Sequence, residues 1–280
     1  MSKGLLDPKV DFVFKNIFGS PNHPEILISF LNATLKAKKK IVNVDIKKTD
    51  IEKQYIEDKY SRLDVKATTS NDEIINIEIQ LKNENNMVKR SLYYLSKMYE
   101  EQLNEKEDYS KLVRTVCINI LNFKYLKTDN FHTGYRFKEI ESNEELTDIM
   151  EVHFIEIPKL QDSSDEKDML VAWTEFLKDP ESEKVRGLEL SIEEIRQAKD
   201  ELIRMSNDST QRELYDMRAN SLRDKMSELN AAERKGIEKG REEGRKEEKI
   251  EIARNMKLSG LDTNTIAKIT NLSEDEIDKL

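Results

Sequence analysis

Residues 61–82, SRLDVKATTSNDEIINIEIQLK, alternate between apolar and polar side chains in two runs that are separated by a polar segment. Alternation with a period of two is typical of strands that bury one face. The intervening segment is suited to a tight turn, because Asn71 tolerates a left-handed conformation. The sequence therefore predicts a β-hairpin, yet it places an acidic residue inside each run, Asp64 in the first and Glu78 in the second.

The register of this hairpin is set by its apolar faces, because a slip of one residue turns every side chain to the opposite face. A three-residue turn at 70–72 brings the two apolar faces together and places Val65 across from Ile77. In that register Asp64 lies directly across from Glu78. Carboxylates at such positions have Cβ atoms about 4.5–5.5 Å apart, and their like charges destabilise the pair.

A hard divalent cation between the two carboxylates would relieve this repulsion, since Mg²⁺ is typically held by one or two carboxylates together with water and phosphate oxygens. Gln80 lies two residues along the same face, where its amide could bind an attacking water or a phosphate oxygen. Lys66 and Lys82 add positive charge of the kind that stabilises phosphoryl chemistry. The alternative is the ordinary solvated face of a two-stranded ribbon, and the D-x13-E-x-Q spacing alone does not decide between the two.

The composition indicates a globular chain with a large amount of exposed helix, because 37% of its 280 residues are charged and its mean hydropathy is −0.74. No apolar run approaches the length of about 18 residues that a membrane-spanning helix needs. The N-terminus lacks the apolar segment of a signal peptide, so we expect a cytoplasmic protein. The single cysteine, Cys117, lies in an apolar run and is expected to be buried.

The charge distribution limits where a nucleic acid could bind. The net charge of −9 argues against a protein that coats nucleic acid. Residues 1–48 hold nine lysines and four acidic residues, whereas residues 139–182 hold fourteen acidic residues and three lysines. A phosphate backbone would therefore approach the N-terminal region and be repelled by the acidic stretch.

Other chemistries find little support in the sequence. The three histidines, His23, His132 and His153, are scattered and do not have the spacing of a zinc site. The chain also lacks a P-loop, a G-x-G-x-x-G motif and a G-x-S-x-G motif.

Hydrophobic periodicity predicts a mixed α/β domain followed by helices. Helices are expected at 8–19, 24–36 and 87–103, and strands at 41–46, 60–69, 73–82, 113–123, 133–140 and 151–158. The helix at 87–103 is expected to bury the stripe Val88, Leu92, Leu95, Tyr99 and Leu103. The later helices are expected near 166–178, 191–206, 209–230 and 231–257. We therefore expect a domain at 1–160, a helical extension at 161–230 and a charged tail at 231–280.

The tail has two features of its own. Gly236, Gly240 and Gly244 recur every fourth residue, which fits either a solvated charged linker or a seam where two helices approach closely in a homodimer. Residues 258–280 resemble a helix-turn-helix in outline, with a capping box at Ser273 and Glu276. The residues expected in its small core are Leu258, Leu261, Ile266, Ile269, Leu272, Ile277 and Leu280. Because its second helix opens with three acidic residues, we favour a protein-contact or folding role over DNA reading.

Three motifs resemble the Rpn family, the recombination-promoting nucleases or putative transposases of the PD-(D/E)XK superfamily. They are LLDPKVDFVFKNIFG at the start, SRLDV…NIEIQ in the hairpin and KRSLYYLSKMYEEQL in the helix that follows. The glycine-punctuated KGIEKGREEGRKEE and the terminal NLSEDEIDKL also look like that family. The resemblance covers about residues 4–160 and 231–280. It implies an α/β fold of the PD-(D/E)XK restriction-endonuclease-like type, a mixed sheet flanked by helices, with an α-helical C-terminal extension.

The resemblance also implies roles for individual residues. Asp64 and Glu78 would be metal ligands, with the backbone carbonyl of Ile79 as a third. Gln80 stands where the superfamily has a lysine, and an amide cannot act as a general base, so activation of water would fall to the metal. Asp11 and Lys15 match the D-x-x-F-K pattern of the family, although they are equally an ordinary i,i+4 pair.

The implied function is a metal-dependent DNA endonuclease that acts in DNA recombination or phage defence. Mg²⁺ is the expected metal, with Mn²⁺ or Ca²⁺ as alternatives. The candidate contacts to the DNA backbone are Lys38, Lys39, Lys40, Lys66 and Lys82. The rival hypothesis is a catalytically inactive, nuclease-like module that binds nucleic acid or protein through its helical tail.

Overall fold

The structure is a computed structural model that describes residues 4–36, 39–47, 65–165 and 167–280. It divides into two compact units, Met1–Ala219 and Asn220–Leu280. Strands occur in the first unit, and the second consists of helices and their connections.

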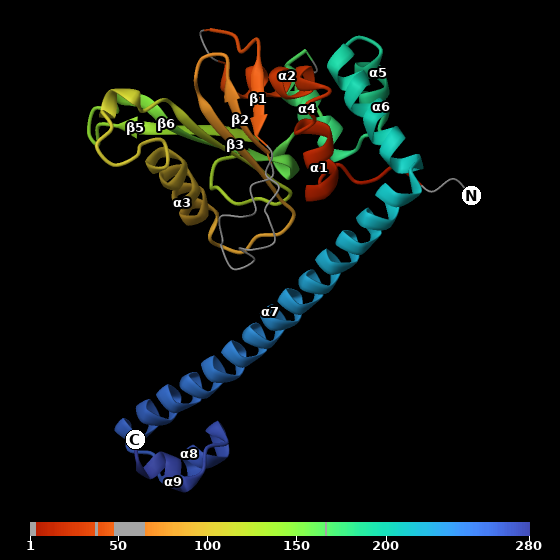
Figure 1. The fold of residues 1–280 in the computed structure, drawn as a ribbon. Helices are drawn as coiled ribbons and strands as arrows, with labels where there is room; N and C mark the ends of the chain where they lie inside the picture. The colour runs from red at the N-terminus through yellow and green to blue at the C-terminus, as the bar shows by residue number, and fades with distance from the viewer. Residues whose placement is uncertain (1–3, 37–38, 48–64, 166) are drawn as a thin grey trace. The chain divides into compact units, whose positions relative to one another are not determined.

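The first unit is built on a mixed sheet that runs in the order β1-β2-β3-β4-β6-β5 through the described residues (Figure 1). Its strands are β1 (Val44–Lys47), β2 (Val65–Thr69), β3 (Ile74–Gln80), β4 (Thr115–Leu121), β5 (His132–Lys138) and β6 (Glu145–Glu156). The central strands β3, β4 and β6 are parallel to one another, while β1, β2 and β5 pair antiparallel with their neighbours. The predicted order of elements up to residue 160 is confirmed, and β4 is buried on both faces.

The predicted hairpin register is confirmed, because Val65 pairs with Ile77. The turn closes with a hydrogen bond of 2.9 Å from the Thr69 N–H to the Glu73 carbonyl, which leaves three residues in the loop. The left-handed residue is Asp72, with φ of 59°, and the prediction that Asn71 would take this conformation is wrong. In three-residue hairpin loops the left-handed residue follows a type I turn and is therefore the last one.

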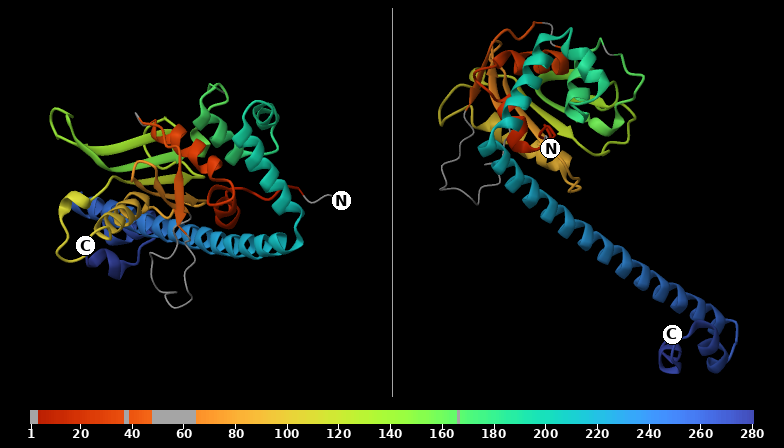
Figure 2. Two further views of the ribbon diagram at one scale, coloured as in Figure 1. Left: turned by 45° about the horizontal axis from the view of Figure 1, so that its top comes forward. Right: turned by 90° about the vertical axis from the view of Figure 1, so that its right-hand side faces the viewer.

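Helices cover both faces of the sheet (Figures 1 and 2). They are α1 (Asp11–Phe18), α2 (Pro24–Leu35), α3 (Met87–Glu100), α4 (Met169–Lys178), α5 (Glu183–Glu189) and α6 (Glu193–Asn207). On one face, Met87 and Leu95 of α3 pack against the apolar side chains of β4 and β6. On the other face Gly19, at the end of α1, lies against Val65 of β2.

The core beside α1 is aromatic. Phe18 stacks on Phe14 with a centroid distance of 4.6 Å and meets the edges of Phe30 and Trp173 at 5.4 and 5.3 Å. All four side chains are almost completely buried. Trp173 is therefore a packing residue, as its apolar surroundings in the sequence indicate.

One predicted apolar face and one predicted strand boundary are wrong. Helix α3 buries the face that contains Met87, Ser91 and Leu95. Val88 and Leu92, which belong to the predicted stripe, are instead 41% and 49% exposed. The helix is rotated by about one residue from the expected orientation, because the polar Ser91 is needed inside, where its hydroxyl donates to Asn119 at 2.9 Å. The first strand begins later than expected, at Val44.

The second unit contains a small three-helix core. It is formed by the end of α7 (Ser209–Leu258), by α8 (Thr263–Thr270) and by α9 (Glu274–Asp278). The buried residues are Ala253, Ile266, Leu272 and Ile277. The capping box of Ser273 and Glu276 is present. Leu258, Leu261 and Ile269 were expected in this core but are 82%, 38% and 59% exposed, because Ala253 and its neighbours on α7 fill the space instead.

Helix α7 is continuous over the two segments for which the sequence predicts separate helices. Its three regularly spaced glycines, Gly236, Gly240 and Gly244, have no neighbouring atom within 4 Å of an added Cβ among the described residues. Across the described residues, no helix combines the length and the apolar character that crossing a bilayer demands.

Candidate active site

The candidate site lies on the face of the sheet that α3 covers. Asn76, Glu78 and Gln80 alternate with apolar residues along β3 and point to this side, as the confirmed register requires. Asn76 and Glu78 are both fully buried. The alternative of an ordinary solvated ribbon face therefore does not hold at these two positions.

Glu78 is held by a cation from α3. The Arg90 Nε donates to Glu78 Oε2 at 3.2 Å, and the carboxylate side chain is 1% exposed. The other oxygen, Oε1, is buried and has no hydrogen-bond partner among the described residues. Burial raises the pKa of Glu78 above its usual 4.5, while the charge and hydrogen bond of Arg90 and the side chain of Asn76 oppose this effect. A buried carboxylate with one open oxygen is costly to the fold, and such groups are characteristic of functional sites.

Arg90 was missed by the sequence reasoning. Its guanidinium lies 5.3 Å from the centre of the Tyr94 ring, one helical turn further along α3. The signal was present in the motif KRSLYYLSKMYEEQL, where a basic residue flanks the buried face of the helix that follows the acid-bearing strand.

Polar groups continue across the same face onto β4. Asn119, the register partner of Glu78, accepts from the Ser91 hydroxyl and donates to the carbonyl of His153 at 3.1 Å. Cys117 is buried as expected, and burial raises the pKa of its thiol to about 12. The thiol is therefore not a nucleophile at neutral pH.

The other predicted residues of the hairpin are only partly placed. Asp64 lies outside the described residues. Lys66 pairs with Asn76 across the strands, which puts it beside Glu78 on the same face, and its ammonium is 3.9 Å from Glu101. Ile79 and Gln80 are in β3, and Lys82 follows it.

The residues of the D-x-x-F-K motif are on α1. Asp11 forms an ion pair of 3.0 Å with Arg218 of α7, whose guanidinium also lies 5.3 Å from the Phe12 ring. The i,i+4 pair between Asp11 and Lys15 that would explain the motif without a function is not formed. Their roles remain predictions.

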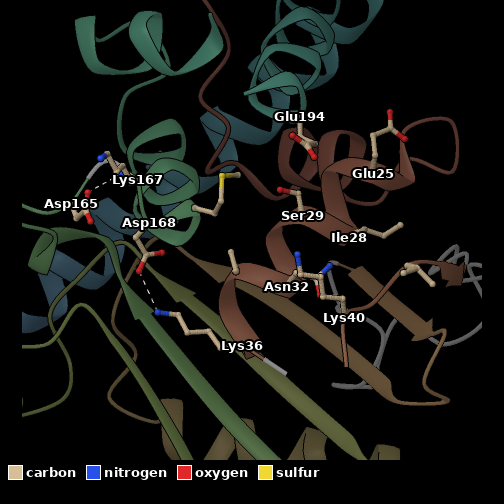
Figure 3. A pocket seen from close by; sticks show the side chains of 13 residues that line it. Glu25, Ile28, Ser29, Asn32, Lys36, Lys40, Asp165, Lys167, Asp168 and Glu194 are labelled. Atoms are coloured by element: carbon tan, nitrogen blue, oxygen red, sulfur yellow. Dashed lines mark hydrogen bonds and ion pairs between the residues drawn. The ribbon is translucent and has the colours of Figure 1, made fainter. Parts of the chain in front are cut away.

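The lysine-rich segment after α2 borders a hollow of about 780 Å³, shown in Figure 3. Lys38 lies outside the described residues, Lys39 is exposed, and Lys40 lines the hollow. The other charged side chains that line it are Lys36, Lys167, Glu25, Asp165, Asp168 and Glu194. Lys36 is already paired with Asp168 at 3.2 Å (Figure 3). With three lysines against four carboxylates, the hollow offers no surplus of positive charge for a phosphate.

A second polar network lies on the opposite face of the sheet. His132 and His153, which are far apart in the sequence, meet with ring nitrogens 2.9 Å apart, and His153 Nε2 lies 2.8 Å from Glu151 Oε1. Glu151 is also paired with Arg114 and Arg136. Burial opposes the ionisation of Glu151, but the hydrogen bonds from His153 and Arg114 outweigh it and lower its pKa to about 2. No group of three or more potential metal ligands occurs here or elsewhere in the described ranges.

Comparison with known proteins agrees with this fold. Residues 8–232 match the model of the PD-(D/E)XK nuclease family transposase. The chain belongs to this family. Residues 246–280 match the C-terminal HTH domain of the Rpn/YhgA-like nuclease family. The mixed sheet with its flanking helices is the PD-(D/E)XK fold that the sequence predicts. No curated protein and no solved structure gives a significant match.

The residues of this PD-(D/E)XK chain fit a divalent cation, the group that nucleases of this kind generally use. The fit rests on Glu78, a hard oxygen donor whose Oε1 is buried and unpartnered within the described part of the chain. Asp64 is the predicted second carboxylate.

Proposed function

We propose that the chain is a metal-dependent DNA endonuclease that hydrolyses phosphodiester bonds. The observation that carries this proposal is the burial of Glu78 in β3 with one oxygen held by Arg90 and the other open. Neither the hairpin nor the core needs a carboxylate at that position, because an apolar residue there would be more stable. Membership of the nuclease family supplies the class of reaction.

Asp64, Glu78 and the carbonyl of Ile79 would hold the cation. When bound, the cation supplies Lewis acidity and a nucleophilic water for phosphodiester hydrolysis. Gln80 would orient water or a phosphate oxygen from the same face of β3, and Lys66 would add positive charge beside it. Because Glu78 is fully buried, its carboxylate has to become accessible to the cation, and this opening does not require DNA.

The experiment is nicking of supercoiled plasmid with Mg²⁺, Mn²⁺ or Ca²⁺. Wild type is compared with Asp64→Asn, Glu78→Gln and the control Glu100→Gln, which removes a carboxylate from an exposed position on α3. We expect metal-dependent nicking by wild type and the control, and a loss of at least about 100-fold in the two site variants. Equal nicking by wild type and Glu78→Gln would refute the assignment, and so would no nicking by wild type with any of the metals.

The second candidate function is a nuclease-like module that binds nucleic acid or protein without cleaving. Gln80 favours it, because an amide replaces the lysine on which the superfamily relies. Binding of DNA by wild type without nicking, and unchanged by Glu78→Gln, would support this candidate over the first.

The biological setting that we propose is recombination of DNA or defence against phage, with the helical tail as a dimerisation or protein-contact element. Truncation after Asn230 tests the tail. A full-length dimer that becomes a monomer on truncation would support a dimer through these helices, and an unchanged oligomeric state would exclude it.

A further inference from the structure

The buried site contains a positively charged side chain, Arg90, that belongs to α3 and not to the hairpin. Two residues after Glu78, where a lysine is expected, Gln80 is neutral. The ammonium of Lys66 on the neighbouring strand lies 3.9 Å from the carboxylate of Glu101. Arg90, from a different element, donates directly to the carboxylate at 3.2 Å. Its own side chain is 21% exposed, so Arg90 lies at the edge of the buried site.

The contact between Arg90 and Glu78 joins one guanidinium nitrogen to one carboxylate oxygen. Arg90 donates through Nε to Oε2 of Glu78, and Oε1 is left without a partner among the described residues. A bidentate pair would have occupied both oxygens. The single hydrogen bond therefore fixes the carboxylate and leaves one oxygen for another ligand.

The position of Arg90 is itself fixed. Its guanidinium lies over the Tyr94 ring at 5.3 Å, and Tyr94 is buried on the same helix. Neighbouring side chains of α3, Met87, Ser91 and Leu95, pack against the sheet. The helix thus presents Arg90 to β3 from a rigid surface, as a group that orients a metal ligand should be.

Resting on the proposed function, we propose that Arg90 is the positioning residue of the metal site: it holds Oε2 of Glu78 so that Oε1 is presented to a divalent cation, and it replaces, from α3, the positive charge that Gln80 lacks. Removal of a group that orients a metal ligand typically weakens metal affinity or activity by about 10- to 100-fold. Arg90 acts through Glu78, so the loss should appear in metal binding before any DNA is present.

The test is a calorimetric titration of Mn²⁺ into the full-length, DNA-free chain, followed by plasmid nicking as a function of Mn²⁺ concentration. Arg90→Met removes the charge and the donor. Arg90→Lys keeps the charge but not the planar fork. The control is Lys89→Met, which removes the same charge from the adjacent, exposed position of α3.

We expect Arg90→Met to bind Mn²⁺ about 10- to 100-fold more weakly than wild type and to regain nicking as Mn²⁺ is raised. Arg90→Lys should fall between the two, and Lys89→Met should match wild type. If Arg90→Met does not fold, as judged by its circular dichroism, the comparison of Arg90→Lys with wild type decides.

Three results would overturn the proposal: unchanged Mn²⁺ affinity in both Arg90 variants, tighter binding by Arg90→Met, or a loss of nicking that saturating Mn²⁺ does not restore. A failure of the proposed function itself looks different. In that case wild type neither binds Mn²⁺ nor nicks, or Glu78→Gln does both as well as wild type.

Discussion

The histidine pair on the face of the sheet opposite Glu78 predicts a specific dependence of stability on pH. Burial lowers the pKa of His132 from 6.5 to about 4, and the charges of His153 and Lys36 act in the same direction. The ring therefore binds a proton more readily in the unfolded chain than in the folded one. The stability that this difference provides is complete above pH 6.5 and is lost as the pH falls through 4.

The lowering of the His132 pKa from 6.5 to about 4 corresponds to about 3 kcal/mol of unfolding free energy. Because the His132 ring is only partly buried, solvent screening reduces this to about 2 kcal/mol. His132→Gln removes the titrating group and keeps an amide that can donate to His153. Between pH 7 and pH 4 we expect wild type to lose about 2 kcal/mol more stability than His132→Gln.

The assay is urea unfolding at several pH values, followed by tryptophan fluorescence. The chain has one tryptophan, Trp173, which is buried in the first unit, so the signal reports that unit. His23→Gln controls for the loss of one imidazole at an exposed position. Parallel curves of stability against pH for wild type and His132→Gln would refute the reasoning.

Three further predictions concern stability. Phe18→Ala should lower the stability of the first unit by about 3–5 kcal/mol in the same urea assay, because Phe18 is fully buried among aromatic rings; a cost below about 1 kcal/mol would contradict this packing. Burial raises the pKa of Glu78, so its ionised form costs stability as the pH rises above 4.5, and metal-free Glu78→Gln should be more stable than wild type at pH 7.5 but not below pH 4.5. If Glu78→Gln is less stable than wild type at both pH values, the ionised Glu78 carboxylate does not destabilise the fold as argued. Gly240→Ala should stabilise the helical form of α7 by about 1 kcal/mol, seen as helicity that persists to higher temperature, since the added Cβ meets nothing among the described residues. Weaker self-association of this variant in sedimentation would instead indicate that the glycines form a seam between two helices.

Much of the fold could be predicted because the sequence patterns are local. The apolar faces of residues 65–69 and 74–80 exclude a slip of one residue, and the three-residue turn then selects the pairing of Val65 with Ile77. The orientation of α3 could not be predicted in this way. Its buried face includes Ser91, and the reason is a partner on another strand, Asn119.

The residues of the candidate site also differ in whether the sequence alone could identify them. Glu78 was predicted from its place opposite Asp64 in a strand that alternates apolar and polar residues, and its burial is consistent with that prediction. Arg90 could not be assigned to the site, because its relation to Glu78 depends on how α3 packs across the sheet. The meeting of His132 with His153 was missed for the same reason, since β5 and β6 bring together residues that the sequence separates.

In the proposed function, Asp64 and Glu78 together hold one divalent cation. The direct measurement is electron paramagnetic resonance of Mn²⁺ titrated into the DNA-free chain, which counts bound ions. We predict one bound Mn²⁺ per wild-type or Glu100→Gln chain and none in Asp64→Asn or Glu78→Gln. Retention of the bound ion at undiminished affinity by either site variant would contradict the account.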